Sequence, residues 1–212
     1  MSIEALTEAA DGPRSKRPAI LAAAVECFGE VGFEGTKWSE VADRVGIGQP
    51  ALYHYFESKT HCLLTIMRLG LRNSDEAFRA AVVESGSAHD ALRAAVRAAF
   101  EVSPQEVQQN RILQSNIALL SGRRSSQREE AERQACRKLV ARIERNWADL
   151  VQDGIDRGQF DRHDPLIMAR SLLGLVVSVW RWYRPDGSAE LPAIAEFIGG
   201  CCVRMVGAQL PA

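Results

Sequence analysis

The sequence of 212 residues lacks the features of several common protein classes. Its 26 Lys and Arg are balanced by 27 Asp and Glu, so the net charge of −1 does not itself indicate a nucleic-acid-binding or membrane-surface protein. There is no uninterrupted run of about 18 apolar residues, and residues 1–12 lack the basic-then-apolar order of a signal peptide. We therefore expect no contact with a membrane.

The cysteines are odd in number, scattered, and never spaced as Cys-x-x-Cys. This pattern indicates reduced thiols in a cytoplasmic protein rather than a disulfide framework. The five are Cys27, Cys62, Cys136, Cys201 and Cys202. The adjacent Cys201 and Cys202 leave two interpretations open, a redox pair or small core residues, and the apolar segment around them favours the core.

No residues have the spacing expected of a catalytic or metal site. The sequence shows no nucleophile–base pair and no cofactor-binding loop, and its four histidines lack metal-ligand spacing. We therefore expect no enzyme activity, no cofactor and no metal.

Strong helix formers dominate the sequence, and no segment alternates as a β-strand does. Apolar residues recur at helical spacing between Gly, Pro and Ser, which predicts an all-α fold of about nine helices. Pro18 is placed to begin the first helix, and Gly32 to interrupt it. Ser103 and Glu106 have the spacing of a capping box at a later helix, which we expect Gly122 to end. A charged run from Arg128 to Arg133 is interpreted as a solvated helix face.

The most informative segment contains two short helices, at about 36–45 and 49–55, that meet at a turn. Small Ala42 lets the helices cross closely, and Gly46 tolerates the backbone conformation of the turn. Apolar residues are placed to fill the gap between the helices: Val41, Val45, Ile47, Leu52 and Tyr55. This is the helix-turn-helix arrangement, in which the second helix enters the major groove of DNA.

The same segment resembles the N-terminal signature of the tetracycline-repressor-like (TetR) family, over residues 18 to about 66. The matching positions are Thr36, Val41-Ala42, Gly46-Ile47, Leu52-Tyr53, Tyr55-Phe56 and Ser58-Lys59. The resemblance implies a homodimer with one recognition helix per half-site and a ligand pocket inside the C-terminal helices. It predicts a disordered tail at 1–12, a DNA-binding domain at 13–62 and a ligand-binding and dimerisation domain at 63–212.

The resemblance also implies DNA contacts at the recognition helix. Gln49 and Ala51 are expected to face base edges, and Gln pairs with adenine in a bidentate way. Tyr53 resembles a phosphate-contacting tyrosine, and His54 is expected to reach backbone or base.

Flanking residues complete the predicted DNA-binding set. Thr36 resembles the cap of the second helix with its hydroxyl near phosphate, whereas Lys37 and Lys59 resemble phosphate-binding lysines. A basic arm is predicted from Arg14, Lys16 and Arg17.

Two positions depart from the family pattern. Trp38 stands where a smaller aliphatic residue is usual, and we expect it to pack into the domain core. Gly48 stands where Ser or Thr often caps the recognition helix; Gly still caps, but without a hydroxyl for phosphate. Because charge over residues 13–62 is balanced, DNA affinity is expected to depend on a few specifically positioned side chains and not on a generally basic surface.

The segment from Val179 to Gly187 is dense in aromatic residues. It resembles a helix end in a branch of actinobacterial TetR-like regulators, some of which respond to acyl-CoA thioesters. An apolar pocket with polar anchors is predicted from Phe100, Arg111, Gln114, Trp147, Trp180 and Tyr183. The alternative is that these aromatics only form core and interface.

Small residues, Gly174 and Ser178, recur one helical turn apart and predict a close helix contact. Together with the final helix, around Phe197, they predict a four-helix dimer interface; the alternative is packing within one chain. The sequence thus predicts a ligand-responsive regulator of transcription, a repressor that a small apolar or acyl-CoA-type effector releases from a palindromic operator in double-stranded DNA. A helical protein-interaction module is the competing hypothesis, but it would need a more apolar recognition face than Gln49, Tyr53 and His54 provide.

Overall fold

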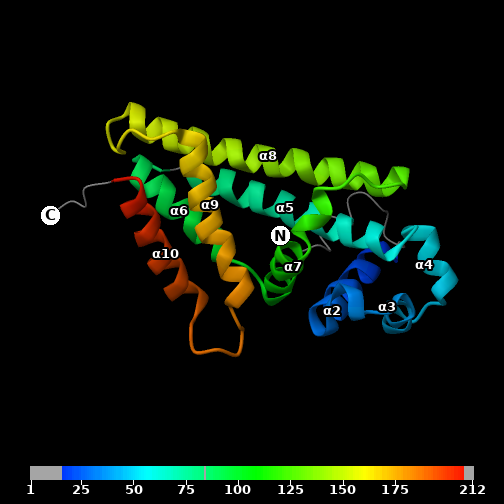
Figure 1. Ribbon diagram of the computed structural model, residues 1–212. Coiled ribbons are helices and arrows are strands. Elements are labelled where there is room, and N and C mark those ends of the chain that lie inside the picture. The colour runs from blue at the N-terminus through cyan, green and yellow to red at the C-terminus, as the bar shows by residue number, and fades with distance from the viewer. Residues whose placement is uncertain (1–15, 84, 208–212) are drawn as a thin grey trace. The chain divides into compact units, whose positions relative to one another are not determined.

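The computed structural model describes residues 16–83 and 85–207, and the predicted tail at 1–12 lies outside them. Nine α-helices, one short 3₁₀ helix and no strand occur in these residues, which confirms the all-α prediction (Figure 1). The elements are α2 (Arg17–Gly35), α3 (Trp38–Val45), α4 (Gln49–Tyr55), α5 (Lys59–Val82), α6 (Ala88–Phe100), α7 (Pro104–Ser115), η1 (Ile117–Leu120), α8 (Gln127–Asp156), α9 (Pro165–Trp182) and α10 (Leu191–Met205).

The helices belong to two compact units. The first unit comprises the described residues up to Asn73 together with Ser103–Lys138, and the second comprises Ser74–Val102 and the described chain from Leu139. Helices α5 and α8 each begin in the first unit and end in the second.

In the first unit, α2 packs against both α3 and α7. One face of α2 is fully buried because apolar side chains recur there at helical spacing, among them Ile20, Leu21 and Phe28. At Gly32 the backbone has φ +80°, so the helical path is interrupted four residues before Thr36. The predicted break at Gly32 is therefore confirmed, and Gly is the residue that adopts this conformation without a Cβ clash.

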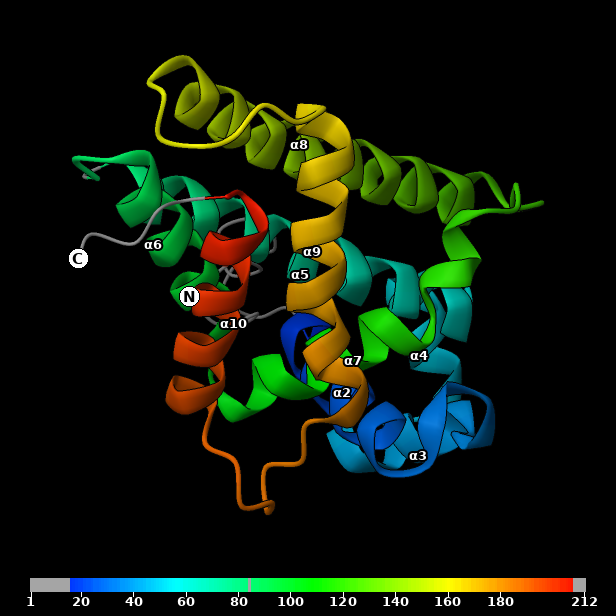
Figure 2. The same ribbon diagram turned by 60° about the vertical axis from the view of Figure 1, so that its left-hand side comes forward.

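In the second unit, α10 packs against α6 and α9, and both lie beside it in Figures 1 and 2. The buried carboxylate of Asp75 connects two of the longer helices. It forms ion pairs with Arg79 on its own helix, at 3.1 Å, and with Arg142 on α8, at 2.8 Å. The side-chain amide of Asn146 donates a hydrogen bond of 2.8 Å to the same carboxylate.

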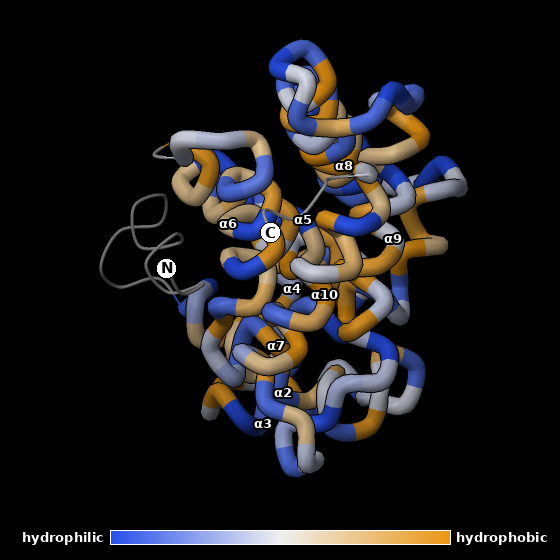
Figure 3. Tube along the Cα trace, turned by 90° about the vertical axis from the view of Figure 1, so that its left-hand side faces the viewer, coloured by the Kyte–Doolittle hydropathy of each residue, from blue (hydrophilic) through white to orange (hydrophobic). Residues whose placement is uncertain are grey.

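Helix α9 leaves much of its apolar surface uncovered. Among the described helices it alone has the length and composition that a membrane crossing requires, properties that it shares with core helices of soluble proteins. Only 28% of its residues are buried, and hydrophobic positions recur along α9 and α10 in Figure 3. Helix α9 therefore presents large apolar side chains to solvent in the single chain, among them Ile167 and Trp182.

Most predicted helix ends agree with the structure, but one does not. Ser103 and Glu106 form the expected capping box at the start of α7: the Glu106 N–H donates to the Ser103 hydroxyl, and the Ser103 N–H donates to the Glu106 carboxylate. Gly122 does not end this helix. It ends at Ser115, and the Asn116 side-chain amide donates a 2.8 Å hydrogen bond to the Ile112 carbonyl in the last turn.

Candidate functional site

Helices α3 and α4 form the predicted helix-turn-helix. Gly46 ends α3 in the left-handed conformation, with φ +69° and ψ +41°, and the Ile47 N–H then donates to the Ala42 carbonyl at 3.0 Å. Gly48 is the N-cap of α4, as expected. Val41 and Leu52 are fully buried between the helices, so the turn is fixed both by its backbone and by its apolar filling.

The candidate contacts on α4 differ in exposure. Gln49, Tyr53 and His54 are exposed, and Ala51 is half-buried. Tyr53 leaves 49% of its surface in solvent although it is a large aromatic residue, and only Leu52 of this helix is buried. The exposed face of α4 thus presents an amide, a phenol and an imidazole, which suit hydrogen bonds to phosphates and base edges.

Thr36 has a different local role from the one expected. The N-cap of α3 is Lys37, not Thr36. The Thr36 side chain is buried, and its hydroxyl donates to the main-chain carbonyls of Gly32 at 2.8 Å and Cys27 at 3.1 Å. Its hydroxyl is therefore directed at main-chain carbonyls of α2 and not toward solvent.

The two candidate lysines also differ. Lys37 is exposed at the start of α3, where its N–H donates to the Glu40 carboxylate at 3.1 Å. The Lys59 ammonium instead donates to the main-chain carbonyls of Phe33 at 2.7 Å and Thr36 at 2.8 Å. Lys59 thus holds the beginning of α5 against the end of α2.

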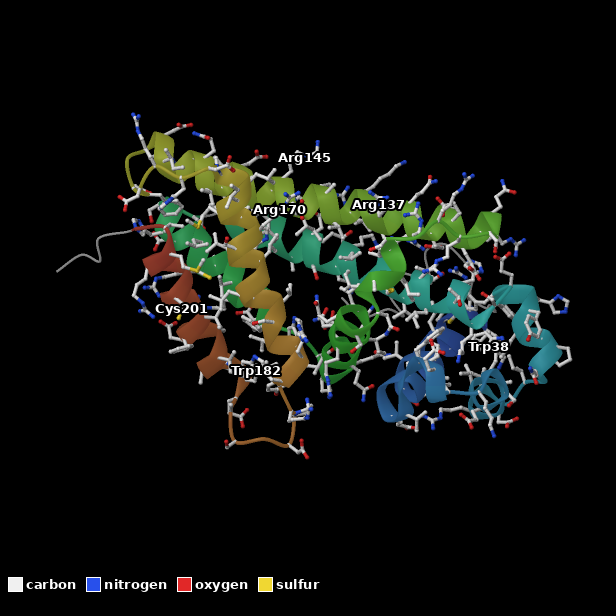
Figure 4. All side chains as sticks on the ribbon, in the orientation of Figure 1. Trp38, Arg137, Arg145, Arg170, Trp182 and Cys201 are labelled. Atoms are coloured by element: carbon white, nitrogen blue, oxygen red, sulfur yellow. The ribbon has the colours of Figure 1, made fainter. Side chains whose placement is uncertain are left out.

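Trp38 packs inward, as expected, and is buried with the helices of this unit (Figure 4). Its indole N–H finds no hydrogen-bond partner among the described residues. The indole ring of Trp38 therefore contributes to this unit by apolar packing and not by a hydrogen bond.

Of the three residues predicted to form a basic arm, Arg17 packs against a ring of the first unit. Arg17 begins α2 and lies over the Phe56 ring, 4.9 Å from its centre. Lys16 is exposed, and Arg14 lies outside the described residues. Arg17 consequently contributes a cation–π contact to the unit rather than extending freely.

The guanidinium of Arg44 is paired with carboxylates of the same unit. Arg44 on α3 pairs with Glu30 at 2.9 Å and Glu26 at 3.3 Å, both on α2. The hydrogen bond from Arg44 lowers the pKa of Glu30. Positive charge at Arg44 is therefore offset locally, whereas Lys16, Lys37 and the α4 face remain exposed candidates for contact with DNA.

The sequence did not indicate a polar contact between the start of α5 and the start of α8. The Ser58 hydroxyl donates to Glu129 at 2.6 Å, and the Ser126 hydroxyl donates to Glu57. Arg68 pairs with Glu132 at 2.5 Å.

These contacts correct the interpretation of Arg128–Arg133 as a solvated face, since Arg133 is buried and donates to the Leu120 carbonyl at 2.9 Å. Partners about 70 positions apart in sequence leave no periodic signal, so these pairs cannot be predicted from the sequence pattern.

The candidate effector residues divide between the two units. In the second unit the Phe100 and Trp180 rings lie 5.5 Å apart, and Trp180 and Tyr183 meet edge to face at 6.3 Å. Trp147 contacts Phe78 instead, at 5.3 Å.

Arg111 and Gln114 belong to α7 in the first unit, where both are half-buried. Phe100 lines a groove of about 130 Å³ between α6 and α10, and Arg111 lines a cavity of about 210 Å³ between α2 and α7. A role for these residues in effector binding stays a prediction.

The cysteine pair on α10 is not symmetric. Cys201 is half-buried and Cys202 is buried, and burial raises the pKa of Cys202 to about 12. A thiol with a raised pKa holds little thiolate at neutral pH, which disfavours redox chemistry at Cys202. In the described part of the chain, no group of three or more His, Cys, Asp or Glu is placed to hold a metal ion.

The chain is similar to solved and characterised regulators along most of its length. The HTH-type transcriptional repressor KstR2 of Rhodococcus jostii is 26% identical over 187 residues, which are 87% of this chain and 88% of the relative. A tetR-family regulatory protein from Rhodococcus RHA1 superimposes with a TM-score of 0.77 at 25% identity, over 92% of this chain and 100% of that one. AibR in complex with isovaleryl coenzyme A and operator DNA has the same fold, with a TM-score of 0.69 at 24% identity, over 88% of this chain and 97% of AibR.

Two family models match the sequence. The model described as bacterial regulatory proteins, tetR family, matches residues 20–66, which contain the helix-turn-helix. The model described as tetracyclin repressor-like, C-terminal domain, matches residues 85–206, more than half of the chain. The helix-turn-helix geometry and both matches agree, and the chain belongs to the TetR family of DNA-binding transcriptional regulators.

Proposed function

We propose that this protein is a cytoplasmic, homodimeric repressor that binds a palindromic operator and releases it when a small apolar or acyl-CoA-type effector binds. The exposed α4 face with Gln49, Tyr53 and His54 carries the proposal, because it presents an amide, a phenol and an imidazole in an arrangement that fits the major groove. In this proposal residues 13–62 bind the DNA, and residues 63–212 bind the effector and form the dimer interface. The repressor mode is supported by the similarity to KstR2, a repressor, over most of both chains.

The dimer is supported by large apolar side chains that remain exposed on α9 and α10. Ile167 is 66% exposed, Trp182 52% and Phe197 67%. Figure 4 places Trp182 near the C-terminal end of α9 and Cys201 on α10. Gly174 has no neighbouring atom within 4 Å of its Cβ position, so a second α9 is free to approach closely there. Two copies of the α9–α10 pair would form a four-helix interface with two-fold symmetry, which matches the symmetry of a palindromic operator.

The effector class is supported by the aromatic cluster of Phe100, Trp180 and Tyr183. Such rings supply the apolar walls that bind acyl chains, while a Tyr hydroxyl supplies a polar contact. AibR, whose fold is similar, was crystallised with isovaleryl coenzyme A and operator DNA. A thioester of a short or branched acyl group is therefore the first effector to test.

DNA recognition is tested by selecting operator sequences from a random library with the purified protein. We expect a palindromic consensus that binds at least about 10³-fold more tightly than random DNA at physiological salt. Gln49→Ala should relax the preference at one base pair per half-site by about 1–3 kcal/mol, whereas the control Gln152→Ala, exposed on α8, should not. Equal affinity for all sequences would remove the repressor proposal.

The effector is tested by titrating coenzyme A and acyl-CoA thioesters into the protein–operator complex. Thioesters should dissociate the complex, and coenzyme A itself should not, because the acyl group supplies the apolar contact. Tyr183→Phe preserves the ring packing and removes only the hydroxyl, so a changed thioester affinity in this variant would locate the site. Dissociation by neither thioester nor other apolar metabolites would contradict this part of the proposal.

A further inference from the structure

A cavity of about 210 Å³ lies within the first unit, between α2 and α7. Its α2 side contains Phe28 and Phe33, whose rings meet edge to face with centroids 5.3 Å apart. Between them Gly32 leaves open space, since nothing lies within 4 Å of its Cβ position. The α2 side of the cavity is therefore an apolar wall built largely from aromatic rings.

The α7 side of the cavity is polar. Arg111 is the one charged residue among those that line it, and Gln108, Ser115 and Asn116 surround it with amides and a hydroxyl. No carboxylate among the described residues pairs with the Arg111 guanidinium, in contrast to Arg44 and Arg133 of the same unit. A half-buried guanidinium that faces a cavity without a counter-ion favours an anion, and a carboxylate best matches its planar fork of donors.

We infer that this cavity is a second ligand site, which binds a compact aromatic carboxylate with its ring against Phe28 and Phe33 and its carboxylate on Arg111. The size supports this class, because a cavity of about 150 Å³ already accommodates a benzene ring. The cavity lies in the first unit, and none of the aromatic residues of the proposed effector cluster, Phe100, Trp180 and Tyr183, lines it, so it does not duplicate the proposed effector site.

The position of the cavity gives the ligand a route to the DNA-binding helices. The main-chain carbonyl of Phe33 accepts a hydrogen bond from Lys59, and the Lys59 ammonium lies 4.4 Å from the centre of the Phe33 ring. A ligand ring packed against Phe33 therefore acts on this contact and on the adjoining Thr36–Lys37 segment, at which α3 begins. Ligand binding should therefore weaken DNA binding, a consequence that rests on the proposed function, whereas ligand binding itself does not.

Calorimetric titration of the full-length protein with sodium benzoate and with uncharged benzamide tests the site. Wild type should bind benzoate saturably at millimolar or lower concentration and benzamide about tenfold or more weakly, because loss of a charge-assisted hydrogen bond costs at least that factor. Arg111→Gln should weaken benzoate binding by a similar factor. The matched control Arg123→Gln, an exposed arginine of the same unit, should bind benzoate as wild type does. Ser115→Trp, which fills the cavity from its exposed rim, should abolish binding.

Three results would overturn the site: no saturable benzoate binding, equal binding of benzamide, or unchanged binding by Arg111→Gln. A separate titration, of operator DNA in saturating benzoate, should show weaker DNA binding by wild type but not by Arg111→Gln. Unchanged DNA affinity would overturn the regulatory consequence. A failure to bind any DNA specifically would remove the proposed function while the calorimetric result still decides the carboxylate site.

Discussion

The ammonium of Lys59 and the ring of Phe33 are in direct contact, with the nitrogen 4.4 Å from the ring centre and 2.7 Å from the Phe33 carbonyl oxygen. A second hydrogen bond, to the Thr36 carbonyl, completes the arrangement. The predicted phosphate-binding lysine therefore also caps the C-terminal end of α2, where the helix dipole favours a cation. An operator phosphate would share this ammonium with two carbonyls. A substitution of Lys59 is therefore expected to change both the stability of the fold and the affinity for DNA.

Substitution of the two candidate lysines should separate these roles. Lys59→Ala removes two charge-assisted hydrogen bonds and should lower the free energy of unfolding by about 2 kcal/mol. Lys37→Ala, at an exposed position, should change it by no more than about 0.5 kcal/mol. Each should reduce the slope of log affinity against log salt concentration by about one, if each contacts one phosphate. Urea denaturation and a salt series of operator binding measure the two quantities, and an unchanged salt slope in Lys37→Ala would exclude that lysine from the interface.

The buried carboxylate of Asp75 predicts a stability effect in the second unit. Asp75→Asn weakens its interactions with Arg79, Arg142 and Asn146 at once, and should cost about 2 kcal/mol because these hydrogen bonds and ion pairs end on a fully buried charge. Both arginines are half exposed and become hydrated, so the loss stays below that of a fully buried pair.

The matched control is Asp153→Asn on α8, which breaks an exposed pair with Arg157, the residue after this helix, and should cost less than about 1 kcal/mol. Urea denaturation of the two variants compares them directly. Equal losses would mean that the Asp75 cluster adds nothing beyond a surface ion pair.

His61 predicts a dependence of stability on pH. Burial lowers its pKa, and its Nδ1 accepts a hydrogen bond from the Glu57 N–H at 3.3 Å, which requires the neutral ring. The unfolded chain therefore binds a proton more readily than the folded chain near the ordinary histidine pKa of about 6.5. The stabilisation is present above that pH and is lost as the pH falls through 6.5 toward the lowered pKa of the folded state.

Thermal unfolding at about pH 7.5 and pH 5.5, on either side of the ordinary histidine pKa, measures this effect. The wild type should lose more stability between them than His61→Gln, which keeps an acceptor but does not titrate. His54→Gln, at an exposed position, should retain the wild-type dependence. An identical pH profile in His61→Gln would show that other groups cause the dependence.

The helix-turn-helix was predictable because its determinants are local. Gly46, the apolar filling at Val41 and Leu52, and the Gly48 cap all act within a few residues of one another, and each has the predicted role. The error at Thr36 arose because its hydroxyl is directed to the end of α2, where the chain path is set by the break at Gly32. The local sequence pattern predicts that a helix forms, but the residue at which the helix begins depends on contacts with neighbouring elements.

Other features were not predictable because they depend on distant pairs. Glu129 and Glu132 have the sequence pattern of a solvated face, yet they contact Ser58 and Arg68, which are far away in sequence. The six predicted ligand-binding residues were chosen by residue type, and type alone does not place Arg111 against α2 or Trp147 beside Phe78. The boundary after residue 62 and the DNA-contacting residues stay predictions, and substitution of Gln49, Lys37 and Lys59 tests three of those residues.

The exposed ring of Phe197 on α10 gives the sharpest test of the dimer. Phe197→Glu places a charge on the proposed interface, and because an interface with two-fold symmetry carries each substitution twice, two charges would be desolvated together. The side chain is 67% exposed within one chain, so the fold of the monomer should be unaffected and its helical circular dichroism unchanged. Light scattering after size exclusion should show a dimer for wild type and a monomer for Phe197→Glu, with loss of tight binding to a palindrome but not to a single half-site. Val83→Glu, an equally exposed apolar position after α5, should remain dimeric, and a Phe197→Glu protein of unchanged mass would place the interface elsewhere.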